Sequence, residues 1–141
     1  MNFSTLRILA IAIALSTSCK KKEDPDTTPP SITVQKPAAD AECTPGAQLE
    51  FEAIASDDKE LSELLVEIHS DLDDHKHESS RSAQWETRSN FYLSGRIQSV
   101  SNTFEIPADA DTGSYHFVVY VLDKAGNRGP LVERDIKLSA K

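Results

Sequence analysis

The segment from residue 68 to residue 77, IHSDLDDHKH, holds three of the four histidines of this chain together with three aspartates. Neutral imidazoles and carboxylates are the side chains that bind Zn²⁺ or Cu²⁺ in proteins. In an extended segment, residues two apart point the same way, so such a stretch can present two rings together. The residues expected to bind zinc or copper are His69, His75, His77, the distant His116, and the aspartates Asp71 and Asp74, with Asp73 as a further oxygen donor.

A metal site of this kind requires His116 to lie beside the segment, which depends on the fold. From residue 31 onward, short runs of alternating apolar and polar residues are separated by turn residues, and no window carries a helical apolar stripe. Seven such runs predict an all-β, seven-stranded antiparallel sandwich of the immunoglobulin-like or fibronectin-III-like type. The expected strands are residues 31–35, 47–55, 63–69, 84–93, 99–106, 114–122 and 131–138.

Two local motifs support the sandwich. Asp111-Thr-Gly-Ser-Tyr115 resembles the tyrosine corner that opens the sixth strand of immunoglobulin-like folds. Asp123-Lys-Ala-Gly-Asn127 resembles the turn that joins the sixth and seventh strands in many bacterial immunoglobulin-like domains. Glycine and asparagine tolerate a positive φ, and an aspartate can cap such a turn through its side chain.

The tyrosine corner also predicts where the histidines lie. If Tyr115 faces the core, then His116 faces outward from the sixth strand, and the alternation of residues 63–69 turns His69 outward from the third. Those two strands are expected to be antiparallel neighbours, which brings both histidines to the same end, with β-carbons within about 5.5 Å if they are directly opposed. The segment with His75 and His77 leaves from that same end.

The N-terminal residues predict export and lipid attachment. Residues 1–18 combine Arg7, a short apolar run and small residues, which is typical of a signal peptide. Cys19 follows them as in a bacterial lipobox, so lipidation at Cys19 is expected, and an ordinary cleaved signal is the alternative. Residues 19–30 contain no apolar side chain after the cysteine and predict a flexible tether, which leaves residues 31–141 as one domain. The expected location is the cell envelope, with the domain held by its lipid at the outer membrane, on the periplasmic or the exposed face.

The net charge and the cysteine content limit the classes of partner that the chain is expected to bind. The chain has 15 basic and 23 acidic residues, and loss of residues 1–18 removes only Arg7, which leaves a net charge of −9. An acidic domain repels nucleic acid and anionic lipid, so membrane contact is expected only through the lipid. If Cys19 is acylated, Cys43 is the one remaining thiol, and it is interpreted as a partly buried free cysteine, with a metal thiolate or an interchain disulfide as alternatives.

Other candidate sites have simpler explanations. Asp57, Asp58, Asp123 and Asn127 are expected at the end opposite the histidines, where their oxygens could bind Ca²⁺, but turn chemistry alone accounts for all four residues. Trp85, Phe91 and Tyr92 could line a sugar-binding face, although single aromatics in strands usually fill the core. The sequence contains no phosphate-binding glycine loop and no nucleophile elbow, so we do not expect an enzyme.

The combination of a lipoprotein signal, ELLVEIHSDLDDHKH and IPADADTGSYHFVVYVLDKAGN resembles a family of Gram-negative lipoproteins. Its members carry a single immunoglobulin-like domain of unknown function, with an H-x(n)-H-x-H loop followed by a G-x-Y-H strand. The resemblance covers nearly all of the mature chain and implies that His69, His75, His77 and His116 are the histidine positions of the family. It implies no particular function.

Two functions are therefore weighed. The first is a membrane-anchored, non-catalytic module that binds zinc or copper through the histidine cluster. The second is an adhesion or assembly module that binds a protein or a glycan through its sheet face or loops, with histidines that are only solvated.

Overall fold

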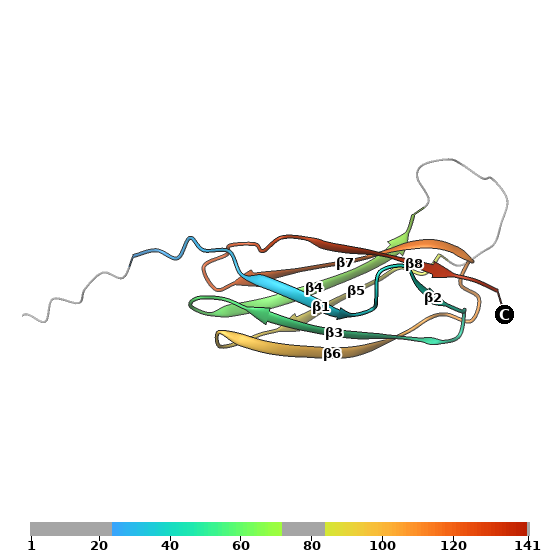
Figure 1. The fold of residues 1–141 in the computed structure, drawn as a ribbon, viewed down its shortest axis with the longest axis horizontal. Helices are drawn as coiled ribbons and strands as arrows, with labels where there is room; N and C mark the ends of the chain where they lie inside the picture. Colours follow the sequence, from blue (N-terminus) through green and yellow to red (C-terminus); the bar gives the residue numbers. More distant parts are fainter. Residues whose placement is uncertain (1–23, 72–83, 141) are drawn as a thin grey trace, which may run out of the picture.

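The fold is an all-β sandwich, seen here in a computed structural model that describes residues 24–71 and 84–140 (Figure 1). The described residues form eight strands rather than the seven expected, because a three-residue strand follows the first one. The strands are β1 (Ser31–Lys36), β2 (Ala41–Cys43), β3 (Gln48–Ser56), β4 (Leu61–Ser70), β5 (Thr87–Tyr92), β6 (Ile97–Glu105), β7 (Gly113–Asp123) and β8 (Val132–Leu138).

The strands form two sheets, one of three strands in the order β1-β3-β6 and one of five in the order β2-β8-β7-β4-β5. All neighbouring pairs are antiparallel except β2 and β8. The additional strand β2 arises because the chain crosses between the sheets after β1 and then runs beside β8. At this crossing the guanidinium of Arg134 donates a hydrogen bond to the carbonyl of Val34, at 2.8 Å, and so joins the two sheets.

The core lies between the sheets and is built from every second residue of each long strand, as the alternation predicts. In β7, the side chains of Tyr115, Phe117, Val119 and Val121 are all buried, as are Leu64, Val66 and Ile68 of β4. Phe51 of β3 lies at the centre, with ring centroids 5.5–6.3 Å from those of Phe91, Phe104 and Phe117. Each such side chain contributes about 1.5–3 kcal/mol by its removal from water.

Both predicted turn motifs are confirmed. The hydroxyl of Tyr115 donates to the carbonyl of Asp111 at 2.8 Å, which is the bond of a tyrosine corner. In the β7–β8 turn, one carboxylate oxygen of Asp123 accepts from the backbone N–H of Asn127 at 2.8 Å and the other accepts from its side-chain amide at 2.7 Å. Gly126 has φ of 90° there, a conformation that glycine adopts without strain.

The described part of the predicted tether, residues 24–30, contacts the sandwich. Pro30 is fully buried, and its carbonyl lies so close to Gly129 that a β-carbon there would be 2.4 Å from it. The carbonyl of Asp26 accepts from the side chain of Asn127 at 3.2 Å. This segment is therefore packed against the module at the end where the β7–β8 turn lies (Figure 1), rather than solvated along its whole length. Among the described residues, those buried in the core run from Pro30 to Leu138.

Candidate metal site

His69 and His116 lie directly opposite each other on the outer face of the five-stranded sheet. β4 and β7 are antiparallel neighbours, as predicted, and their register pairs these two residues. The centroids of the two imidazole rings are 5.5 Å apart. The strands position the rings because Ile68 and Phe117, the inward neighbours in the chain, are anchored in the core.

Three carboxylates surround the His116 ring. Its Nε2 is 2.8 Å from Oδ1 of Asp71, and its Nδ1 is 3.0 Å from Oδ1 of Asp135 and 3.1 Å from Oε1 of Glu133. The register explains this environment, since Asp135 of β8 is paired with His116 and Glu133 lies two residues away on the same face. Asp71 follows His69 by two residues just beyond the end of β4.

These contacts favour the charged imidazolium form of His116. Burial lowers the pKa of this half-buried ring, but the hydrogen bond and charge of Asp71, together with Glu133 and Asp135, outweigh burial and raise its pKa above the ordinary value of 6.5. A protonated ring donates from both nitrogens, which matches a carboxylate on each side. A metal ion bound at this ring must therefore displace a proton.

The chemistry of the group suits a divalent metal. One nitrogen of His116 and one carboxylate oxygen each of Glu133 and Asp135 all lie within 4.8 Å of one another, the spacing of side chains that can close on one ion. Binding at Nδ1 leaves Nε2–H to donate to Asp71, the arrangement in which a carboxylate orients a metal-binding imidazole. His69 lies outside this group of three, although its ring is next to that of His116.

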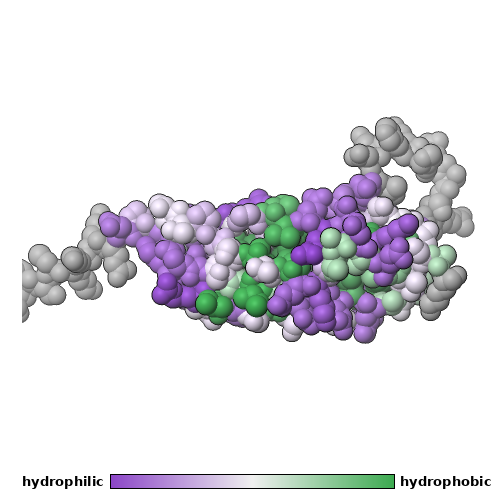
Figure 2. Space-filling view, viewed as in Figure 1, coloured by the Kyte–Doolittle hydropathy of each residue, from purple (hydrophilic) through white to green (hydrophobic). Residues whose placement is uncertain are grey.

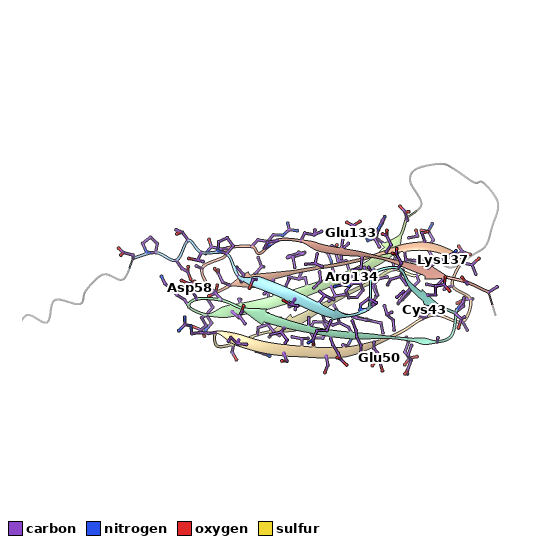
Figure 3. The ribbon with its side chains drawn as sticks, in the orientation of Figure 1. Cys43, Glu50, Asp58, Glu133, Arg134 and Lys137 are labelled. Carbon is purple, nitrogen blue, oxygen red and sulfur yellow. The ribbon has the colours of Figure 1, made fainter. Side chains whose placement is uncertain are left out.

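The structure thus brings together some of the predicted residues and adds two. His69, Asp71 and His116 meet at this end, whereas Asp74, His75 and His77 fall outside the described residues, as does Asp73. Glu133 and Asp135 were not predicted. The alternation in β8, VERDIKL, was the available signal, because it places Glu133, Asp135 and Lys137 on one face. Figure 3 shows Lys137 toward the end of the molecule that lies opposite Asp58, with Glu133 between the two.

The surface beside the histidines is shallow rather than cleft-like. A depression of about 420 Å³ between β4 and β5 is lined by Glu67, His69, Glu86 and Arg88, among others. Glu67 and Arg88 form an ion pair across the two strands. Figure 2 shows hydrophilic residues on both sides of a hydrophobic band in the middle of the face that it presents.

The residues predicted to bind calcium are divided between two local arrangements. Asp57 and Asp58 form a group with Asp26, in which the ligand oxygens lie within 4.8 Å of one another. One oxygen of Asp57 already accepts from the backbone N–H groups of Lys59 and Glu60, at 2.8 and 2.7 Å. Asp123 lies outside that group and is bonded instead to Asn127 in their turn, while the side chain of Asn127 also donates to the carbonyl of Asp26 at 3.2 Å. Hydrogen bonds within turns therefore account for the presence of Asp57, Asp123 and Asn127 without a bound Ca²⁺.

The cysteine and two of the three aromatic residues considered as sites are at least partly buried. Cys43 is a half-buried free thiol in β2, and burial raises its pKa, which disfavours the thiolate. Trp85 is buried against Tyr115, with ring centroids 5.9 Å apart, and Phe91 packs against the core. Of the three aromatics considered for a sugar-binding face, Tyr92 alone is exposed, at 85%.

Several solved structures are similar to this chain at low sequence identity. The match to OgpA from Akkermansia muciniphila has a TM-score of 0.53 and 10% identity and covers 79% of this chain and 30% of that one. The SrpA adhesin from Streptococcus sanguinis matches with a TM-score of 0.47, 21% identity and coverages of 82% and 57%. The fibronectin(III)-like modules of CbhA from Clostridium thermocellum match with a TM-score of 0.47, 17% identity and coverages of 79% and 47%.

This chain spans only about half the length of the last two of these structures. At such identities, the OgpA likeness shows the fold alone. None of the curated proteins matches the sequence. Within the described residues, there is no helix of the length and apolar character needed to cross a membrane.

At the level of sequence families, one model matches the chain over residues 17–139, which include every strand of the sandwich. Its description is Domain of unknown function (DUF4625). The chain therefore belongs to the DUF4625 family, a family whose function is not known.

Proposed function

We propose that this module binds one divalent transition-metal ion, zinc or copper, at the end that carries His69 and His116, and that it performs no catalysis. One observation carries the proposal. His69 and His116, which are distant in the sequence, lie side by side, and a nitrogen of His116 lies within 4.8 Å of carboxylate oxygens of Glu133 and Asp135, close enough for all three to bind one ion. Imidazole nitrogen and carboxylate oxygen together suit Zn²⁺ and Cu²⁺.

The proposal also includes predicted ligands that lie outside the described residues. Asp74, His75 and His77 follow Asp71 by no more than six residues in the sequence, and Asp71 is already in contact with His116. Asp74, His75 and His77 are therefore further candidate ligands. They would complete the coordination of an ion held by His116.

Titration calorimetry with Zn²⁺ and Cu²⁺ on the module from residue 24 onward tests the proposal. Wild-type protein should bind about one ion per chain, and His69→Ala/His116→Ala should abolish that binding. Asp57→Asn/Asp58→Asn, which changes the carboxylates of the opposite end, is the matched control and should bind as wild type does. Weak uptake without a defined stoichiometry, equal in all three proteins, would contradict metal binding at this end.

We also propose that the module is attached to the cell envelope by a lipid on Cys19. The sequence of residues 1–19 supports this proposal. Residues 24–30 pack at the β7–β8 turn, whereas His116 lies near the other end of β7. Anchored in this way, the metal-binding end would face away from the membrane. Mass spectrometry of the mature protein tests the anchor: a diacylglyceryl mass on the peptide that begins at Cys19 supports it, and an unmodified N-terminus contradicts it.

A second candidate function is binding of a protein or glycan partner through the outer face of the five-stranded sheet. One observation favours it: Tyr120 lies on that face with the guanidinium of Arg128 stacked 4.0 Å from its ring centroid. Aromatic rings and arginine are enriched where proteins bind partners. Under this alternative the histidines are solvated, so the calorimetric titration above separates the two functions.

A further inference from the structure

Within residues 24–71 and 84–140, the two sheets have four edge strands, and three of them carry features that discourage pairing with another chain. β1 has a register shift between Val34 and Lys36, and prolines flank it. β2 is only three residues long. β5 is six residues long and carries the ion-paired Arg88. Short length, irregular register, proline and charge are the means by which proteins protect sheet edges.

The fourth edge strand, β6, is neither short nor irregular in register, and it contains no proline. It runs for nine residues, IQSVSNTFE, and pairs with β3 through an uninterrupted register from Ile97 to Glu105. It contains no proline and no basic residue, and its one charge, Glu105, is at its end. In the described part of the chain, the three-stranded sheet ends at β6, which lies at the margin of the sandwich (Figure 1). A long regular edge offers backbone N–H and C=O groups to a further strand.

We propose that the β6 edge pairs with the β6 edge of a second copy of this chain, antiparallel and about a two-fold axis at Ser101. The two three-stranded sheets would then form one continuous sheet of six strands across the dimer. A two-fold contact must be self-complementary, because each residue meets its partner in both directions. The sequence of β6 meets that requirement when it is centred on Ser101.

The side chains on the exposed face of β6 are complementary in this register. Ser101 meets its own counterpart, and Ser99 meets Thr103 of the second copy. Small hydroxyl-bearing pairs of this kind stabilise antiparallel strands. At the ends, Glu105 meets Ile97 of the second copy rather than another carboxylate. No like charges are therefore opposed, although the chain as a whole is acidic.

Ser101 is the position that tests this geometry, because only a residue on the axis meets itself. Ser101→Lys opposes two ammonium groups across the axis, and Ser101→Glu opposes two carboxylates, with β-carbons about 5 Å apart. An equal mixture of the two variants instead opposes a lysine to a glutamate. Thr33→Lys is the matched control, because Thr33 is exposed on the same sheet but on β1. Glu52 of β3 lies opposite Ser101, so a charge at position 101 could also change the stability of the monomer. Melting temperatures of each variant therefore confirm that it is folded.

Sedimentation equilibrium of the module from residue 24 onward, whose core is complete, gives the result. Wild type and Thr33→Lys should show a concentration-dependent monomer–dimer equilibrium. Each Ser101 variant alone should dimerise at least tenfold more weakly, and the mixture should recover the wild-type dimer. A wild-type module that stays monomeric at every concentration overturns the proposal, and so does a dimer that Ser101→Lys leaves unchanged. The proposal is independent of metal binding, so the measurements are made with a chelator present.

Discussion

His69 and His116 are 47 residues apart in the sequence and directly opposed in the sheet, with ring centroids 5.5 Å apart. On the other side of β7, Asp135 of β8 is paired with His116. His69, His116 and Asp135 therefore lie side by side across β4, β7 and β8. Because β7 lies between its two neighbours, His116 is in contact with acidic residues from both sides. When its ring is protonated, His116 therefore forms ion pairs with Asp71 just beyond the end of β4 and with Glu133 and Asp135 of β8.

The first prediction concerns the titration of His116. Because Asp71, Glu133 and Asp135 outweigh burial and raise its pKa, the NMR titration midpoint of the His116 ring should lie above the ordinary 6.5 in the metal-free module. A group with a raised pKa in the folded state stabilises it fully below the unfolded value, and that stabilisation is lost as pH rises through the folded pKa.

The stability difference between wild type and His116→Gln should accordingly be largest below the unfolded pKa of about 6.5 and should shrink as pH rises through the raised pKa of the folded ring. Urea denaturation at several pH values measures this difference. Glu63→Gln, a change of one carboxylate farther along the outer face of β4, should show no such trend. A midpoint at or below 6.5 would show that the three carboxylates do not outweigh the effect of burial on the ring.

Asp71 provides the second prediction, because it contacts the nitrogen of His116 that faces away from Glu133 and Asp135. If the metal binds at Nδ1, Asp71 orients the ring without binding the ion. Loss of such an orienting carboxylate weakens metal binding by about 10–100-fold. Asp71→Asn should therefore reduce zinc affinity by that factor in calorimetry while the stoichiometry stays near one. An affinity equal to that of wild type would exclude this role for Asp71.

The tyrosine corner gives a third prediction. Burial, above all, raises the pKa of Tyr115, so its hydroxyl stays protonated and donates to the carbonyl of Asp111. Tyr115→Phe removes that donor and should lower the free energy of unfolding by about 1–2 kcal/mol. Tyr92→Phe removes a hydroxyl from an 85% exposed side chain and should change stability by less than about 0.5 kcal/mol. Equal effects of the two substitutions in urea denaturation would contradict this account.

The fourth prediction concerns the β7–β8 turn. Asp123 is 2% exposed and accepts two hydrogen bonds from Asn127. Asp123→Ala leaves both donors without this acceptor and should cost about 2–3 kcal/mol, because bonds to a charged group are the stronger ones. Asp109→Ala, at an exposed position, is the control for loss of a carboxylate. Thermal or chemical denaturation compares the two variants, and an unchanged stability of Asp123→Ala would show that the turn does not depend on its side chain.

Much of the fold could be predicted because two motifs fix the phase of β7. Once Tyr115 faces the core, alternation places Phe117, Val119 and Val121 inside and His116 outside, and the antiparallel neighbour β4 follows. Strand β2 could not be predicted in the same way, because three residues are too few for a periodic signal. Its strand conformation comes from pairing with β8 rather than from its own sequence.

The site was predicted in part for the same reason. His69 and His116 could be brought together because each lies on a strand whose phase the sequence defines. The positions of Glu133 and Asp135 beside His116 depend on the register between β7 and β8. The sequence does not define that register, because it follows from the conformation of the turn that joins the two strands. Packing of residues 24–30 likewise depends on a tertiary contact, the approach of the Pro30 carbonyl to Gly129, which composition alone does not reveal.

The proposal of a metal site at the histidine end is tested most directly by paramagnetic broadening. Cu²⁺ is added in substoichiometric amounts to isotope-labelled module, and ring and backbone NMR signals are followed residue by residue. The signals of His69, His116, Glu133 and Asp135 should broaden first, while those of Asp26, Asp57 and Asp58 at the opposite end stay sharp. Broadening that begins at the opposite end, or that spreads evenly over the surface, would contradict a metal site built around His116.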